Sequence, residues 1–143
     1  QLSSIDNVHV LGEQTDIAAF SAFDLEIWGR AHEDYNEINP LEGAPQRSAG
    51  RHIVAGHGHF AEERTPEGQP GPGWLFTPED IEATDADYVA LGHWNRKVQV
   101  GTGNVPAWYS GSPDVAGTVN AIRLGSSGGV DISHAPVAGP PKT

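Results

Sequence analysis

Two histidines, His57 and His93, each follow a short apolar segment that ends in glycine: residues 53–56 (IVAG) and residues 89–92 (VALG). Neutral imidazole is a good ligand for divalent metals of intermediate softness. If the two segments are neighbouring parallel strands, both imidazoles project from the carboxyl edge of one sheet, where open α/β sheets bind ligands. One such histidine alone is more often a surface or loop residue. The repeated pattern instead predicts that His57 and His93 bind one metal ion.

His59 lies two residues beyond His57, on the same side of the chain if the backbone stays extended. It could be a third metal ligand or a hydrogen-bond donor to phosphate, and a solvated loop position is equally open. A small cupin-like barrel using His57 and His59 would also need a downstream glutamate and histidine at strand spacing. Glu62 and Glu63 lie in a segment rich in Pro and Gly instead, so this hypothesis is disfavoured.

The remaining histidines show no comparable setting, and we expect surface or structural roles for them: His9, His32, His52 and His134. The four tryptophans are expected to pack in the interior. Trp94 is the exception kept open, because it stands between His93 and Asn95. Residues 110–113 (SGSP) are typical of a turn, and nothing there resembles the strand–nucleophile–helix elbow of a serine hydrolase.

The elements that position the two histidines form a predicted strand–helix–strand unit. Residues 51–56 and 87–92 have the short apolar runs of buried strands. Between them, Thr77 as N-cap, Pro78 at the first helical position and two acids in the first turn predict a short helix that ends near Thr84. We expect residues 33–50 and 61–73 to be loops.

Further strands are predicted on both sides of this unit. They comprise residues 8–11, 23–29, 97–101, 107–110, 118–124 and 129–133, the last four antiparallel. The fold class expected is α/β (α+β), a mixed β-sheet with few short helices. Residues 1–135 are expected to form one domain and residues 136–143 a tail.

The amino-acid composition limits which metal ligands and which substrates are possible. The 143 residues contain no cysteine, which excludes disulfides and thiolate zinc sites and is compatible with a cytoplasmic protein. A metal would have to be held by His, Asp, Glu or Asn, which suits manganese, iron or zinc. A net charge of −11 disfavours non-specific nucleic-acid binding but not a phosphate substrate at a metal centre. No apolar run is long enough to span a membrane.

Residues 87–95 (DYVALGHWN) and 109–113 (YSGSP) together resemble the calcineurin-like metallophosphoesterase superfamily, especially its branch of repair exonucleases and phosphodiesterases. In that family a segment Asp-Tyr-apolar-Ala-Leu-Gly-His-x-His is followed by a Tyr-Ser/Pro-Gly-Ser-Pro turn. Residues 53–57 resemble the isolated metal histidine of the family, and residues 8–12 and 25–29 resemble two of its earlier strands. The likeness covers roughly residues 7–125.

The resemblance implies half of a four-layer αββα sandwich and a phosphodiesterase, phosphatase or nuclease activity. In the family two ions about 3.5–4 Å apart hold the phosphoester. Carried over by position, His57 and His93 would share one of these ions, and Asn95 would face the other through its side-chain oxygen. The family has histidine where this chain has Asn95, so the second metal position would be weaker.

The family's amino-terminal motifs, Asp-x-His, Gly-Asp-x-x-Asp and Gly-Asn-His-Asp/Glu, have no counterpart here. The resemblance therefore implies a carboxyl-terminal half that carries no complete catalytic set and is inactive alone. We expect it to associate with the missing amino-terminal half or with a second copy. A first residue that is not methionine suggests a trimmed product or a piece of a longer chain. A non-catalytic binding or scaffold module that kept the fold is the alternative.

Overall fold

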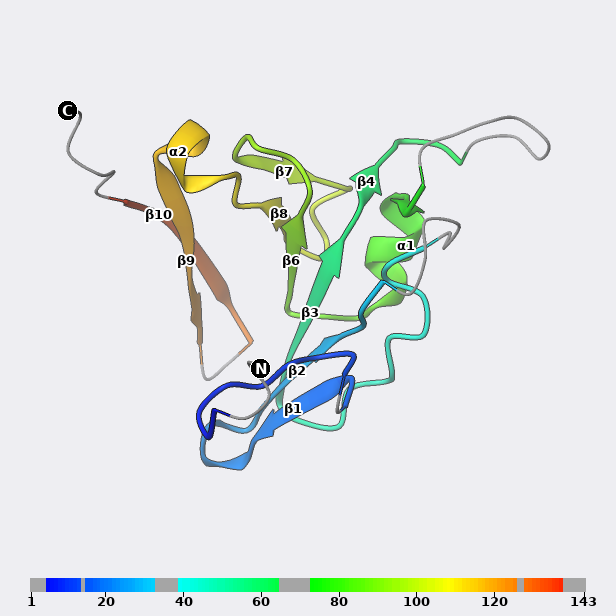
Figure 1. Cartoon of the computed structure of the whole chain (residues 1–143). Coiled ribbons are helices and arrows are strands. Elements are labelled where there is room, and N and C mark those ends of the chain that lie inside the picture. The colour runs from blue at the N-terminus through cyan, green and yellow to red at the C-terminus, as the bar shows by residue number, and fades with distance from the viewer. Residues whose placement is uncertain (1–4, 14, 33–38, 65–72, 126–127, 138–143) are drawn as a thin grey trace.

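A computed structural model describes residues 5–13, 15–32, 39–64, 73–125 and 128–137. The chain forms a mixed α+β fold (Figure 1). Its main sheet has six strands in the order β1-β2-β3-β6-β8-β7, and two small two-stranded sheets, β4-β5 and β9-β10, accompany it. The helices are short. None of the described helices has the length and apolar character needed to cross a membrane.

The strands and helices have the following bounds. The main sheet contains β1 (Ile17–Phe20), β2 (Leu25–Gly29), β3 (Arg51–His57), β6 (Tyr88–Gly92), β7 (Val98–Val100) and β8 (Ala107–Tyr109). The small sheets contain β4 (His59–Phe60), β5 (Leu75–Phe76), β9 (Thr118–Leu124) and β10 (Val130–Pro136). The helical segments are η2 (Ser21–Phe23), α1 (Pro78–Ala83) and α2 (Pro113–Ala116).

The predicted strand–helix–strand unit is present, and it places β3 beside β6 in parallel. Helix α1 between them begins at the predicted residue, Pro78. The backbone N–H of Thr77 donates to Oδ2 of Asp80 at 2.8 Å, as in a capping box. Ile81 of this helix is fully buried against the sheet, together with Val54 and Val89. This packing fixes the relative position of the two strands that end at His57 and His93.

Several local predictions were wrong. Residues 8–11 form no strand, and only Leu11 makes an isolated bridge, to Thr15. Strand β1 was not predicted, and α2 forms where only a turn was expected. Strand β8 pairs antiparallel with β7, as predicted, but parallel with β6. Of the expected tail, residue 136 pairs with Thr118 at the end of β10, and residues 138–143 lie outside the described residues.

The two faces of the main sheet are covered unequally. Helix α1 and the β4-β5 pair cover one face, where Val54, Val89 and Tyr109 are fully buried. On the other face lies the β9-β10 hairpin (Figure 1). There Ala55, Ala90 and Trp108 remain half-buried. The residues on a face of a sheet become fully buried when helices or a second sheet cover that face completely. Because these residues are only half-buried, the second face is covered incompletely.

Candidate functional site

The carboxyl edge of the sheet brings His57 and His93 together. His57 is the last residue of β3 and pairs in register with Gly92 of β6, so His93 follows directly beside it. The two imidazole centroids lie 5.5 Å apart, with the rings nearly perpendicular. Two imidazoles that bind one zinc ion have centroids about 4.5–5.5 Å apart, since each metal–nitrogen distance is about 2.1 Å. The observed separation lies at the upper end of that range.

The backbone at the end of β6 is specialised for this approach. A Cβ atom at position 92 would lie 2.9 Å from Nδ1 of His57, so glycine leaves the room that the His57 ring occupies. His93 itself has φ +120°, a conformation that side-chain-bearing residues rarely adopt. Such backbone strain persists only where the surroundings enforce it, and it concentrates at functional sites. Both features favour a functional reason for the placement of His93.

The pKa of His57 is lowered from its ordinary value. Partial burial is the largest cause, and the nearby His93 and His32 add electrostatic repulsion against a charged ring. A lower pKa keeps the imidazole neutral at neutral pH. The neutral form is the one that offers a nitrogen lone pair to a metal ion.

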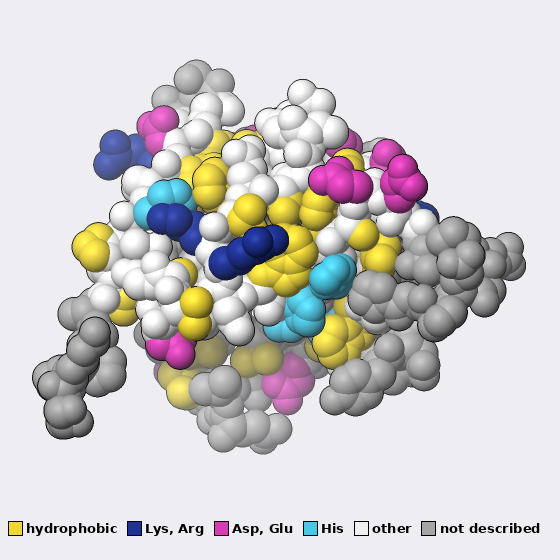
Figure 2. Space-filling model, turned by 90° about the horizontal axis from the view of Figure 1, so that it is seen from above, with side chains coloured by type: hydrophobic (Ala, Val, Ile, Leu, Met, Phe, Trp, Pro, Cys, Tyr) yellow, Lys and Arg dark blue, Asp and Glu magenta, His cyan; other side chains and the backbone are white. Residues whose placement is uncertain are grey.

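His59 lies on the other side of His93, with its ring centroid 5.8 Å away. Its ring accepts a hydrogen bond at Nδ1 from the indole N–H of Trp94, at 3.3 Å. Trp94, left open by the sequence, is thus part of this cluster. The histidine side chains gather side by side on the face that includes this edge (Figure 2).

Tyr109 positions the segment between His57 and Phe60. Its hydroxyl donates to the carbonyl of Gly58 at 2.6 Å and accepts from the N–H of Phe60 at 3.0 Å. The side chain is fully buried, and burial raises the pKa of this phenol well above its usual range. The tyrosine therefore stays a neutral donor. In the sequence, Tyr109 is recognisable only as part of the turn motif at residues 109–113. Nothing in that motif indicates that its hydroxyl holds the backbone of Gly58 and Phe60.

His32, for which a surface or structural role was expected, lies in a loop beside His57 and is hydrogen-bonded to its backbone. Its Nε2 lies 2.6 Å from the carbonyl oxygen of His57, to which it can only donate. The ring centroid of His32 lies 5.7 Å from that of His57 and 4.1 Å from that of Trp74. His32 follows β2 after a short irregular segment, so no strand pattern in the sequence marks it.

Asn95 is exposed, and its backbone carbonyl accepts a hydrogen bond from the N–H of Ser112 at 3.1 Å. This bond ties the segment after His93 to the start of α2. Within the described part of the chain, no hydrogen bond links the Asn95 side chain to the three histidines His57, His59 and His93. The structure thus places Asn95 near the edge in sequence without joining its side chain to the cluster.

The donor set at the edge fits part of a metal site. Among the described residues, no group of three or more His, Asp or Glu side chains converges as an ion would require. His57 and His93 could supply two nitrogen ligands, whereas a zinc ion takes four ligands and harder cations take about six. The remaining ligands would have to come from water or from another segment.

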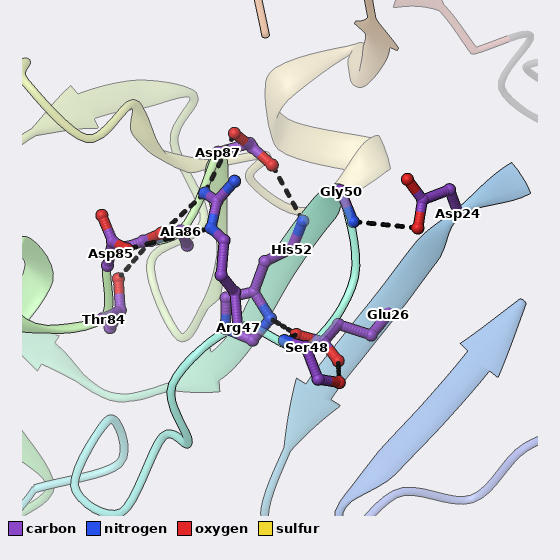
Figure 3. Close-up of polar contacts among 10 residues, drawn as sticks. All are labelled: Asp24, Glu26, Arg47, Ser48, Gly50, His52, Thr84, Asp85, Ala86 and Asp87. Atoms are coloured by element: carbon purple, nitrogen blue, oxygen red, sulfur yellow. Dashed lines mark hydrogen bonds and ion pairs between the residues drawn. The ribbon is translucent and has the colours of Figure 1, made fainter. Parts of the chain in front are cut away.

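A second polar cluster lies at the opposite, amino-terminal end of β3 (Figure 3). His52 is fully buried there, with Nδ1 at 2.8 Å from Oε1 of Glu26, an ion-pair distance without hydrogen-bond alignment. Its backbone N–H donates to Asp87 at 2.8 Å, and Asp87 also accepts from Arg47 at 3.1 Å. Ser48 donates to both carboxylate oxygens of Glu26. The structural role expected for His52 fits this network.

Glu26 is buried, yet its pKa is lowered. Burial pushes the pKa upward and is the largest single contribution, but the hydrogen bonds from the Ser48 side chain and backbone, with His52, together outweigh it. Glu26 is therefore held as a carboxylate between two strands. The network joins β2, β3 and the loop that precedes β3.

Between the second face of the sheet and the hairpin lies a hollow of about 500 Å³. Trp108 and Ala90 line it from the sheet, and Ile122 and Asn120 line it from the hairpin. Asn120 donates to the hydroxyl of Tyr88 at 3.2 Å, so a polar contact bridges the two layers. His57 borders the same hollow.

Comparison of the chain with models of protein families, with curated proteins and with solved structures finds no match.

Proposed function

We propose that this chain is one half of a metal-dependent phosphoester hydrolase, in which His57 and His93 bind one divalent cation. The observation that carries the proposal is the 5.5 Å separation of the two imidazole centroids at the ends of adjacent parallel strands. The strained backbone of His93 and the lowered pKa of His57 support it. Both properties are expected of a metal ligand and have no evident value for folding.

The cation would be manganese, iron or zinc, the metals that nitrogen and oxygen ligands favour. A bound cation would supply positive charge beside a phosphoryl group, which promotes attack at phosphorus. Following the resemblance, Asn95 would face a second cation; His59, two residues beyond His57, would approach the substrate. Since Asn95 makes no described side-chain contact with the histidines, the second metal position depends most on the other half.

The other half would complete both the fold and the ligand set. A full αββα sandwich would place a second layer of strands and helices over the half-covered sheet face and the hollow beside the β9-β10 hairpin. The missing motifs would add carboxylate, amide and imidazole ligands to the two that His57 and His93 provide. Alone, this chain would bind metal weakly and turn over slowly.

We favour an amino-terminal half, in the same or a separate polypeptide, over a second copy as the partner. Each copy carries a net charge of −11, and this charge opposes self-association. The same charge favours a small phosphoester over long nucleic acid as substrate. A cytoplasmic location, which the lack of cysteine supports, belongs to the same proposal.

The proposal is tested by reconstitution. The chain is co-expressed with an amino-terminal half from a metallophosphoesterase, and hydrolysis of bis(p-nitrophenyl) phosphate is measured with manganese. We expect activity that is lost in His57→Ala and in His93→Ala and kept in His9→Ala, because His9 is exposed and its ring packs against Phe20 of β1. Recovered activity that survives both site variants would contradict the assignment.

A binding or scaffold module without catalysis is the second candidate. The exposed Asn95 and the lack of a three-residue metal group among the described residues favour it. It predicts that manganese leaves the melting temperature unchanged. A rise in melting temperature that both His57→Ala and His93→Ala abolish would exclude this candidate.

A further inference from the structure

The contact between Trp94 and His59 determines which nitrogen of His59 carries its proton. The indole nitrogen of Trp94 has a hydrogen and no available lone pair, so it is only a donor. At 3.3 Å it donates to Nδ1 of His59, and Nδ1 must therefore present its lone pair. A neutral imidazole carries one proton on one of its two nitrogens. The proton of His59 accordingly lies on Nε2.

This arrangement excludes His59 as a ready metal ligand. Its Nδ1 lone pair is engaged by Trp94, and its Nε2 holds a proton instead of a lone pair. A metal ion on either nitrogen would have to displace the indole or the proton. The N–H at Nε2 is instead a hydrogen-bond donor, the group that binds an oxygen of a phosphate ester.

Both partners of the contact are held in place. The Trp94 ring stacks on Tyr109 with a centroid distance of 4.6 Å and an angle of 13° between the rings. The guanidinium of Arg96 lies 4.9 Å from the centroid of the Trp94 ring. The hydroxyl of Tyr109 in turn binds the backbone of Gly58 and Phe60, the residues on either side of His59. Tyr109 thus fixes the tryptophan and the histidine relative to each other.

We propose that Trp94 is a positioning residue that holds His59 as a neutral Nε2–H donor, which binds a phosphoester oxygen beside the cation of His57 and His93. The substrate class in this inference rests on the proposed function. The proton position does not, because it follows from the hydrogen bond alone. Of the roles open to His59 from the sequence, the contact with Trp94 selects the phosphate donor over the third metal ligand.

The proton position is tested by NMR on the full chain labelled with 15N-histidine. Long-range proton–nitrogen spectra distinguish a protonated ring nitrogen from an unprotonated one. We expect Nδ1 of His59 to be unprotonated and Nε2 protonated in the wild type. Trp94→Phe, which keeps a ring against Tyr109 but removes the N–H, should shift His59 toward a mixture of the two tautomers.

Trp108→Phe is the matched control, because the indole nitrogen of Trp108 has no hydrogen-bond partner among the described residues. This variant should leave the His59 spectrum unchanged. A wild-type spectrum with the proton on Nδ1 would overturn the inference. So would a Trp94→Phe spectrum identical to that of the wild type.

The ligand role is tested on the same sample with zinc and then with dimethyl phosphate, a stable phosphodiester. Zinc should shift the ring nitrogens of His57 and His93 and leave the His59 tautomer in place. Dimethyl phosphate should then shift the Nε2–H signal of His59, and His59→Ala should weaken its binding by about tenfold, the effect of losing one hydrogen bond of about 1.4 kcal/mol. His59→Gln, which retains an N–H donor, should recover most of that loss.

The two proposals fail in different ways. If zinc shifts His57 and His93 but also replaces the proton on Nε2 of His59, the inference about His59 is wrong and the proposed metal site stands. If the His59 tautomer is as expected but zinc shifts neither His57 nor His93, the proposed function is wrong and only the positioning role of Trp94 stands. A phosphodiester that leaves the Nε2–H signal unchanged in the zinc-bound protein would refute the donor role.

Discussion

His52 and His57 lie on the same strand, β3, and their surroundings differ at the two ends. At the amino-terminal end, His52 is fully buried, its backbone N–H donates to Asp87, and its ring lies at ion-pair distance from Glu26 (Figure 3). At the carboxyl end, His57 is exposed and lies beside another imidazole, and among the described residues no carboxylate is paired with it. Five residues along one strand thus separate a structural histidine from one that is available for chemistry.

The difference shows what distinguishes the two roles physically. A buried polar residue stabilises a fold when neighbouring groups satisfy it and connect separate elements. A residue that binds a ligand needs access, a rigid backbone and a lone pair that no neighbour already uses. The end of β3 at His57 has these properties, and the end at His52 does not. The following predictions test this contrast, beginning with the largest expected effect.

Removal of Glu26 should strongly destabilise the buried end. Glu26→Ala leaves His52 next to an empty space and removes the acceptor of Ser48, so we expect a loss of about 3 kcal/mol in the free energy of unfolding. His57→Ala, at the exposed end of the strand, should change it by less than about 0.5 kcal/mol. Urea unfolding of the three proteins measures both. Equal losses of unfolding free energy in Glu26→Ala and His57→Ala would contradict the difference proposed between the two ends of β3.

Tyr109→Phe should cost about 2 kcal/mol, because it leaves the carbonyl of Gly58 and the N–H of Phe60 without their buried partner. The same variant should disturb His59, whose neighbours lose their brace. Urea unfolding gives the first effect and the NMR signals of the His59 ring give the second. Destabilisation without any change at His59 would show that Tyr109 supports the fold but does not position the site.

Glu26, at the buried end of the sheet near His52, should also determine part of the protein's stability at acid pH. The pKa of Glu26 is lowered in the folded protein relative to its ordinary value of 4.5, so its contribution is complete above that value. As the pH falls below 4.5 and through the lower folded pKa, the carboxylate must take up a proton and this contribution is lost. Glu26→Gln should therefore show a flatter decline of unfolding free energy with falling pH. An unchanged slope would mean that Glu26 does not carry this dependence.

Gly92→Ala should affect the exposed end with little cost to the fold. The added Cβ would lie 2.9 Å from Nδ1 of His57, and the exposed imidazole can move away. We expect a change in stability below about 1 kcal/mol but about tenfold weaker zinc binding, as for other groups that orient a metal ligand. Calorimetric titration with zinc measures the affinity. Gly129→Ala is the control, since a Cβ there meets no atom within 4 Å.

Much of the fold was predictable from local sequence. The apolar runs that become β3 and β6 and the capping residues of α1 are local signals, and the structure has these elements at the predicted places. Strand β1 was missed because it is only four residues long with two alanines at its centre, which disfavour strands, and because pairing with β2 defines it. The parallel pairing of β8 with β6 is likewise a long-range property that a short segment does not encode locally.

The candidate site was predictable where local sequence patterns mark its residues and not where long-range packing places them. Gly–His endings on two strands that run in parallel indicated that His57 and His93 would meet, and the structure brings them side by side. The approach of His32 and the bracing by Tyr109 depend on loops and on packing across the sheet, so no spacing in the sequence marks them. The tautomer of His59 required the contact with Trp94, which only the three-dimensional arrangement reveals.

His57 and His93 are proposed to bind the same cation. The zinc content of the protein after equilibrium dialysis tests this shared binding most directly. Because two histidine ligands alone bind zinc weakly, the chain is dialysed against zinc raised to millimolar concentration, and its metal is determined by elemental analysis alongside His57→Ala, His93→Ala and the control His9→Ala. We predict about one zinc ion per chain for the wild type and for His9→Ala, as one shared tetrahedral site requires. Both site variants should then bind almost none. Zinc retained in full by either site variant, or absent from the wild type, would contradict the account.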